Sequence, residues 1–186
     1  MEDLIDEIFP SYQEPTITSR FSLELQEAYQ RAFDRQITTK KSIESADMTG
    51  TLIRSHAAKM ISQFAMNVLG KNPDLSRRCA FSDIQDQSLE MQYYIELSCE
   101  LWLMWLQSDG MPSNIFNPWD TVTRAQFGTM LSRLLYGSTY NTLETENWYV
   151  YHLQALKKVD IMKKIDTPFD PEQRWFVMLM MKRSVK

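Results

Sequence analysis

The sequence predicts an all-α fold of three helix-loop-helix units arranged as a pseudo-threefold bundle. Thr123 and, three residues later, Gln126 form a capping box, in which each side chain pairs with a backbone amide that the first helical turn leaves free. Behind this cap, apolar residues fall on one helical stripe: Phe127, Met130, Leu131, Leu134 and Leu135. Strand-period alternation of useful length does not occur in the chain. Helices are therefore the expected elements throughout.

The same pattern recurs twice more along the chain. Arg54 stands 70 residues before Arg124, and Arg174 stands 50 residues after it. Each arginine leads a comparable apolar stripe: Ala57, Met60, Ile61, Phe64, Ala65, Val68 and Leu69 after the first, and Val177, Met180, Met181 and Val185 after the last. Repetition at this scale predicts three related units.

In chain order, the first helix of each unit is predicted over 23–36, 89–106 and 147–159, from apolar residues at helical spacing. The second helices are predicted from Arg54 to Gly70, from Thr123 to Gly137, and from Pro171 to the end of the chain. Pro171 follows Asp170, an arrangement typical of a helix start. The units are expected at approximately 23–75, 79–137 and 140–186.

Residues 1–22 are interpreted as an N-terminal arm or linker. Pro10 and Pro15 break any helix begun near Asp3. The arm also lacks the basic and apolar regions of a signal peptide. It is expected to dock partly on the domain through apolar side chains: Leu4, Ile5, Ile8 and Phe9.

Three segments of the middle unit carry a family resemblance. They are Phe81-Ser82-Asp83-Ile84, Phe116-Asn117-Pro118 and the run from Val122 to Gln126. Together they resemble the S-layer homology (SLH) repeat, whose pattern opens F-x-D-[VI] and closes F-x-P-x-x-x-[IV]-T-R-A-[EQ]. The first and third units are weaker copies, with Ile53 and Gln173 in place of the capping threonine. The resemblance covers about 160 residues, all but the arm.

The resemblance implies a non-catalytic anchoring module, exported to the bacterial cell surface, that binds an acidic, pyruvylated-type wall polysaccharide or peptidoglycan-linked polymer. The Arg-led helices would form a central bundle, and the glycan would lie in grooves between units, held by guanidinium groups and free helix-start amides. The expected glycan-binding residues are Arg54, Arg124, Arg174, Thr123, Gln126, Asp120, Trp119 and Trp148.

Two alternatives stay open. Each arginine can instead pair with a neighbouring acid or with backbone carbonyls. Likewise, the chain can be an all-helical protein-interaction or surface-layer assembly domain that keeps the fold without binding glycan. An exported protein without a leader is expected to be a segment of a longer precursor, or else the chain is not exported.

Tryptophan stands at places where the family has glycine or a small residue: Trp102, Trp105 and Trp175. One hypothesis is that the gene comes from a lineage that reads UGA as glycine. The alternative is that these are genuine core or surface tryptophans.

Composition bounds the function further. A net charge of -4 over 186 residues argues against nucleic-acid binding, which requires clustered cations, and no apolar run reaches the ~20 residues of a membrane span. His56 and His152 are the only histidines, and no catalytic, phosphate-binding or metal-ligand motif is present, so neither an enzyme nor a cofactor is expected. Cys79 and Cys99 can form a disulfide or remain two buried thiols.

Overall fold

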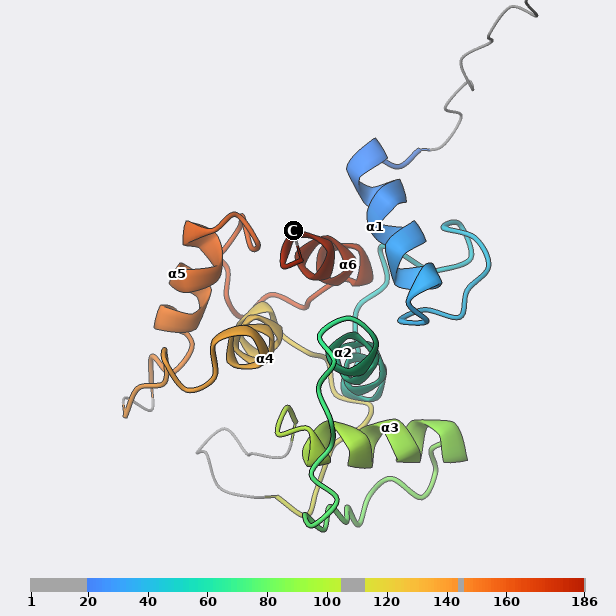
Figure 1. Ribbon diagram of the computed structural model, residues 1–186, viewed down its shortest axis with the longest axis vertical. Helices are drawn as coiled ribbons and strands as arrows, with labels where there is room; N and C mark the ends of the chain where they lie inside the picture. Colours follow the sequence, from blue (N-terminus) through green and yellow to red (C-terminus); the bar gives the residue numbers. More distant parts are fainter. Residues whose placement is uncertain (1–19, 105–112, 144–145, 186) are drawn as a thin grey trace, which may run out of the picture.

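The computed structural model describes residues 20–104, 113–143 and 146–185, and in these residues the protein is all-helical (Figure 1). The six helices are α1 (Leu23–Asp34), α2 (Arg54–Asn67), α3 (Leu89–Glu100), α4 (Arg124–Tyr136), α5 (Val150–Lys158) and α6 (Arg174–Arg183). The predicted fold class is confirmed. The expected docking of the arm through Leu4, Ile5, Ile8 and Phe9 and the interpretation of Trp105 lie outside the described residues.

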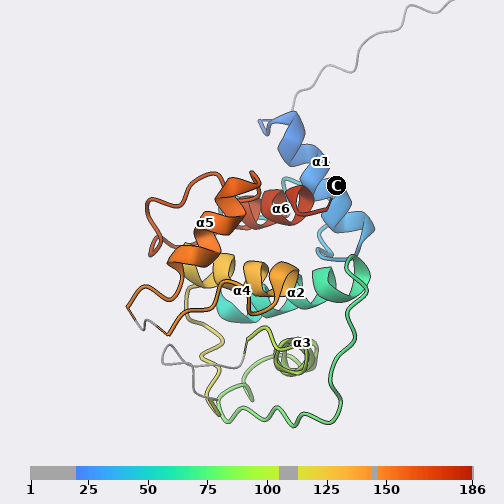
Figure 2. The ribbon, with the colours of Figure 1, turned by 60° about the vertical axis from the view of Figure 1, so that its left-hand side comes forward.

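The three Arg-led helices α2, α4 and α6 lie in the middle of the molecule, with α1, α3 and α5 around them (Figures 1 and 2). Each outer helix packs mainly on the inner helix of a different unit: α1 on α6, α3 on α2, and α5 on α4. The units are therefore consecutive along the chain but interlocked in space.

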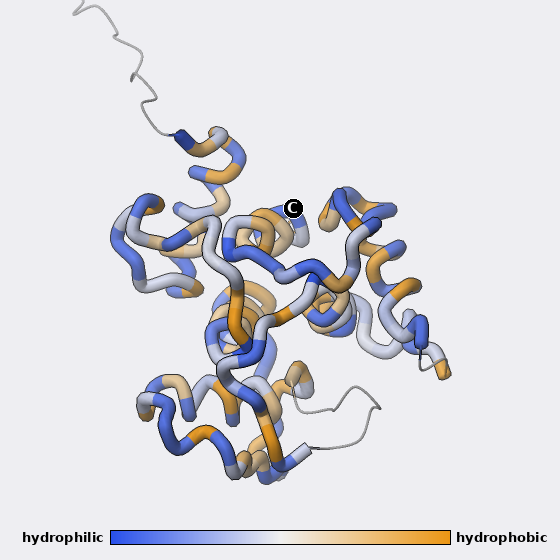
Figure 3. Tube along the Cα trace, turned by 180° about the vertical axis from the view of Figure 1, so that it is seen from behind, coloured by the Kyte–Doolittle hydropathy of each residue, from blue (hydrophilic) through white to orange (hydrophobic). Residues whose placement is uncertain are grey.

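The segments before the inner helices are joined by a closed ring of three backbone hydrogen bonds. Leu52 N donates to Glu172 O at 2.8 Å, Glu172 N to Val122 O at 2.8 Å, and Val122 N to Leu52 O at 2.9 Å. All three residues are at most 1% exposed, and each stands two residues before the arginine of its unit. The view from behind shows these segments meeting near the centre (Figure 3). The pseudo-threefold relation of whole units stays a prediction.

The three outer helices also end in the same way. Gln36, Trp102 and Asp160 have φ values of 59°, 62° and 58°, in the left-handed region. The amide of the next residue bonds to the carbonyl five residues before it: Ile37 to Ala32, Leu103 to Ser98 and Ile161 to Leu156. This is a Schellman ending. It stops α3 at Glu100, six residues before the predicted end at 106.

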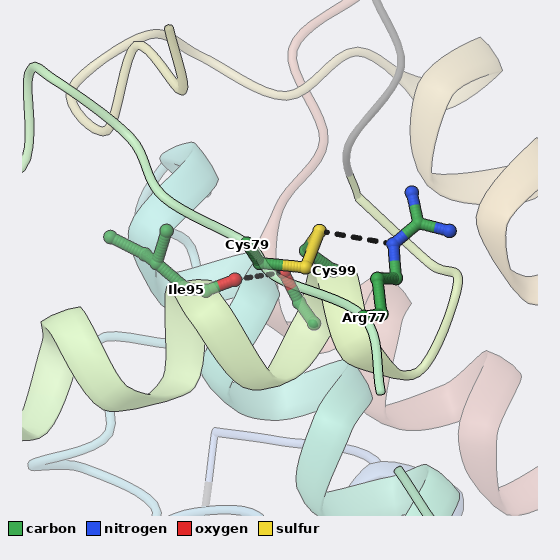
Figure 4. Close-up of a disulfide and its surroundings, with 5 residues drawn as sticks. Arg77, Cys79, Ile95 and Cys99 are labelled. Carbon is green, nitrogen blue, oxygen red and sulfur yellow. Dashed lines mark hydrogen bonds between the residues drawn. A yellow bond between two sulfur atoms is a disulfide. The ribbon is translucent and has the colours of Figure 1, made fainter. Parts of the chain in front are cut away.

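Cys79 and Cys99 form a disulfide with a Cα–Cα distance of 6.0 Å (Figure 4). The bond requires the segment before Phe81 to run back beside the end of α3, and Asp74 N donates to Glu100 O there at 3.0 Å. Arg77 Nε lies 3.4 Å from Cys99 Sγ. Of the two open alternatives for the cysteines, the structure has the disulfide.

Candidate functional site

The start of each inner helix is bonded to a loop of another unit. The amides of the first two helical residues donate to backbone carbonyls there: Arg54 to Asp120 and Ser55 to Pro118, Arg124 to Asp170 and Ala125 to Pro168, Arg174 to Gly50 and Trp175 to Met48. These contacts define three junctions, named here after their arginines. The amides at these two positions are thus occupied, which differs from the expectation that they are free for a ligand.

At the Arg124 junction the guanidinium is enclosed by protein. Arg124 is 5% exposed, and its Nη1 lies 2.5 Å from Thr167 Oγ1 and 3.3 Å from Thr167 O. Its Nε lies 3.7 Å from the buried Glu172 carboxylate, and the Phe176 ring centre is 5.4 Å from its Cζ. The hydrogen bonds and burial leave this group little surface for a glycan.

At the Arg174 junction the guanidinium is paired with an acid. Its Nη1 lies 2.5 Å from Asp47 Oδ2, and its Nη2 lies 3.0 Å from His56 Nδ1. Burial, and then the charge of Arg174, lower the pKa of His56, so a neutral imidazole can accept this hydrogen bond. A Cβ on Gly50 would lie 2.0 Å from Asp47 Oδ2, so a larger residue there would displace the side chains of this pair.

At the Arg54 junction the guanidinium keeps open donors. Arg54 Nε donates to Phe116 O at 2.6 Å, and the guanidinium carbon lies 4.8 Å from the Phe116 ring centre. Within the described ranges, its two terminal nitrogens have no hydrogen-bond partner. Burial lowers the pKa of Arg54, while the charges of Asp120 and Asp83 oppose that shift. A guanidinium stays protonated in folded proteins, so the group is a cation at neutral pH.

The loop beside Arg54 is held by two aspartates. Asp83 accepts hydrogen bonds from the amides of Phe116 at 2.8 Å and Asn117 at 2.7 Å. Asp86 accepts one from the Trp119 indole at 2.6 Å, and Trp119 is 61% exposed. Neither aspartate was among the expected site residues, although Asp83 is the acid of the F-x-D-[VI] motif.

The remaining expected residues have other partners. Thr123 and Gln126 form the predicted capping box, with Gln126 N to Thr123 Oγ1 at 3.3 Å and Thr123 N to Gln126 Oε1 at 2.9 Å. Trp148 lies in a different aromatic cluster. Its ring centre is 5.4 Å from that of Tyr149, which in turn is 5.3 Å from Phe169 in the loop of the Arg124 junction. Asp120 is exposed at the Arg54 junction, next to Trp119.

The expected residues thus divide between junctions. Arg54, Trp119 and Asp120 come together, whereas Arg124, Arg174 and Trp148 belong to other places. Among the described residues, no group of three or more His, Cys, Asp or Glu side chains is arranged to hold a metal ion. Nor does any helix in those ranges have the length and apolar character needed to cross a membrane. Comparison with protein-family models and with curated proteins finds no match.

Proposed function

We propose that the chain is a non-catalytic anchoring module that binds an acidic, pyruvylated-type cell-wall polysaccharide at the bacterial surface. The observation that carries the proposal is the Arg54 junction, where a guanidinium with open donors stands at the helix start that is bonded to the loop of an exposed tryptophan, Trp119. The resemblance of residues 81–126 to the SLH repeat supports the same function, as does the inner position of the three Arg-led helices.

The chemistry of this junction suits an acidic sugar. A guanidinium binds a carboxylate through two parallel hydrogen bonds, which would hold a pyruvate ketal. The exposed face of Trp119 can pack against the C–H face of a pyranose ring. The exposed Asp120 offers an acceptor for sugar hydroxyls. A ligand carboxylate requires hydrogen-bond donors, and the carboxylates of Asp83 and Asp86 are acceptors, so we assign the ligand carboxylate to Arg54 alone.

One observation favours the alternative, an all-helical protein-interaction or surface-layer assembly domain without glycan binding. The guanidinium groups of Arg124 and Arg174 are already hydrogen-bonded within the protein, to Thr167 and to Asp47 respectively. Two of the three junctions would then hold the fold together, and only the Arg54 junction would remain for a ligand.

Purified wall sacculi, with the secondary polymer retained or removed, separate the two functions in a pull-down. The anchoring module should sediment with polymer-bearing sacculi and stay in solution with stripped ones. In calorimetry with the isolated acidic polymer, Arg54→Gln should weaken binding by about 1.5 to 3 kcal/mol, the value of a hydrogen bond to a charged group. The matched control is Arg78→Gln, at an exposed arginine.

Circular dichroism of both variants checks that the fold is intact. Equal affinities of Arg54→Gln and Arg78→Gln would contradict the assignment of Arg54. Equal sedimentation with both kinds of sacculi would contradict the proposed binding to the polymer and would favour the protein-interaction domain.

A further inference from the structure

A pocket of about 90 Å³ lies on another part of the molecule, between α1 and the C-terminal ends of α2 and α6. Its floor consists of side chains that are between 1% and 4% exposed: Ala28, Ala32, Ile37, Phe64, Met178 and Met181. This floor is wholly apolar. The pocket is distinct from the three junctions, which lie at the N-terminal ends of the inner helices.

The rim of the pocket is basic. It carries Arg31 and Arg35 from α1 and Lys182 from α6. Lys182 is paired with Glu27, but Arg31 and Arg35 have no carboxylate within 4.0 Å among the residues that the structure describes. Among those residues, the only hydrogen bonds of their guanidinium groups go to backbone carbonyls, Val185 O at 3.4 Å and Asn67 O at 3.3 Å. An apolar side chain flanked by carboxylates would complement both floor and rim.

We propose that the occupant is the segment 1–9 of this same chain, MEDLIDEIF. Its charged residues are all acids (Glu2, Asp3, Asp6 and Glu7), and they alternate with four large apolar residues (Leu4, Ile5, Ile8 and Phe9). A cavity of about 150 Å³ accommodates benzene, so one of about 90 Å³ suits a single aliphatic side chain. The segment therefore matches the pocket in charge and in size.

The linker between the segment 1–9 and α1 is long enough for the segment to reach the pocket. Residues 10–19 join the segment to Arg20, and ten extended residues reach at most about 33 to 36 Å. The 12 residues of α1 rise by about 18 Å, so the linker can return along the whole helix. Tethering of this kind gives an effective concentration of the order of millimolar. Contacts that are weak one by one then suffice for docking.

Methyl NMR of the full chain with ¹³C-labelled methionine tests the proposal. Ile5→Ser combined with Ile8→Ser should shift the methyl signals of Met178 and Met181, which line the pocket, and leave that of Met130 in place. The matched control is Ile17→Ser, a change of the same kind outside the segment, which should move none of the three signals. In an Arg31→Gln, Arg35→Gln background the shift caused by the segment variants should become smaller, because the rim no longer holds the acids.

Unmoved Met178 and Met181 signals in the Ile5→Ser, Ile8→Ser variant would overturn the proposal. Shifts that depend on protein concentration would also overturn it, since a second copy would then supply the occupant. Shifts independent of dilution, and reduced in the arginine variant, are the expected result.

Discussion

The Glu172 carboxylate lies 3.7 Å from Nε of Arg124, and both side chains are buried. The other two units have aliphatic residues at the position of Glu172, Leu52 and Val122, so only one of the three residues in the ring of backbone hydrogen bonds carries a carboxyl group. Burial raises the pKa of Glu172 to about 7, although the Gln173 amide and the Arg124 charge act in the opposite direction.

This pKa predicts a pH-dependent stability. The pKa of Glu172 is about 7 in the folded protein and near the ordinary 4.5 in the unfolded chain. Its contribution is therefore complete below pH 4.5 and is lost as the pH rises through 7, by up to about 3 kcal/mol. In urea denaturation, the free energy of unfolding of the wild type relative to that of Glu172→Gln should fall by this amount over the same pH range. Parallel curves for the two proteins would mean that Glu172 is ionised throughout.

His152 predicts a pH dependence of stability with the opposite sign. The side chain is 0% exposed, its Nδ1 lies 3.0 Å from Ser132 Oγ, and burial, followed by the charge of Arg133, lowers its pKa to about 4. The unfolded chain takes up the proton near pH 6.5, so stability should fall as the pH drops from 6.5 towards 4, by up to about 3 kcal/mol.

His152→Gln should abolish this loss of stability at acidic pH, even if the substitution itself lowers the stability at neutral pH. Between pH 4.5 and 6.5 the two groups oppose each other, and the wild type should change little there. Each variant should then reveal the slope of the other group. An unchanged slope in His152→Gln would contradict the assignment to His152.

Gly128 predicts a packing limit in α4. A Cβ at this position would lie 2.2 Å from Leu153 Cδ2 and 2.9 Å from Met162 Cε. Gly128→Ala gains helix propensity of up to about 1 kcal/mol, but overpacking costs about 1 to 3 kcal/mol, so the variant should be less stable in chemical denaturation. Leu153→Ala should cost less in the Gly128→Ala background than in the wild type. Additive losses would show that the two residues do not compete for space.

The sequence was sufficient for the features that are local. The Thr123–Gln126 capping box lies within one helical turn, and the apolar stripes behind the arginines follow from helical spacing, so both were predicted and confirmed. The partners of Arg124 and Arg174 were not. Thr167 and Asp47 are 43 and 127 residues away, and no local pattern indicates which loop lies against which helix start.

The buried Glu172 was also missed, although aligning the three units places it opposite Leu52 and Val122. When the three units are aligned, one position has an aliphatic residue in two units and a carboxyl group in the third. Such a difference can be found by comparing the repeats of a single chain. The disulfide stayed undecided because its formation depends on the path of residues 74–81, which only the structure shows.

Trp102 carries the last prediction, because it stands where the backbone favours glycine. Its φ of 62° is left-handed, a conformation that costs an L-residue about 1 to 2 kcal/mol. Part of this is offset by Arg77, whose guanidinium carbon lies 3.9 Å from the Trp102 ring centre. Trp175, by contrast, lies in helix α6 with its indole bonded to Gln173 at 2.6 Å. Of these two, only Trp102 occupies a position that suits glycine by conformation.

The comparison that isolates the backbone is Trp102→Gly against Trp102→Ala, since both remove the ring and its contact with Arg77. Glycine should be more stable than alanine by about 1 kcal/mol at this position, because only alanine keeps the left-handed strain. At Leu89, the first residue of α3, the order should reverse, because glycine is the poorer helix former. If alanine equals glycine at 102, the helix end relaxes and no strain is stored there. Mass spectrometry of the natively expressed protein then decides the codon hypothesis: an indole mass at residue 102 rules out glycine at that codon, and a glycine mass shows that translation supplies the residue that this turn favours.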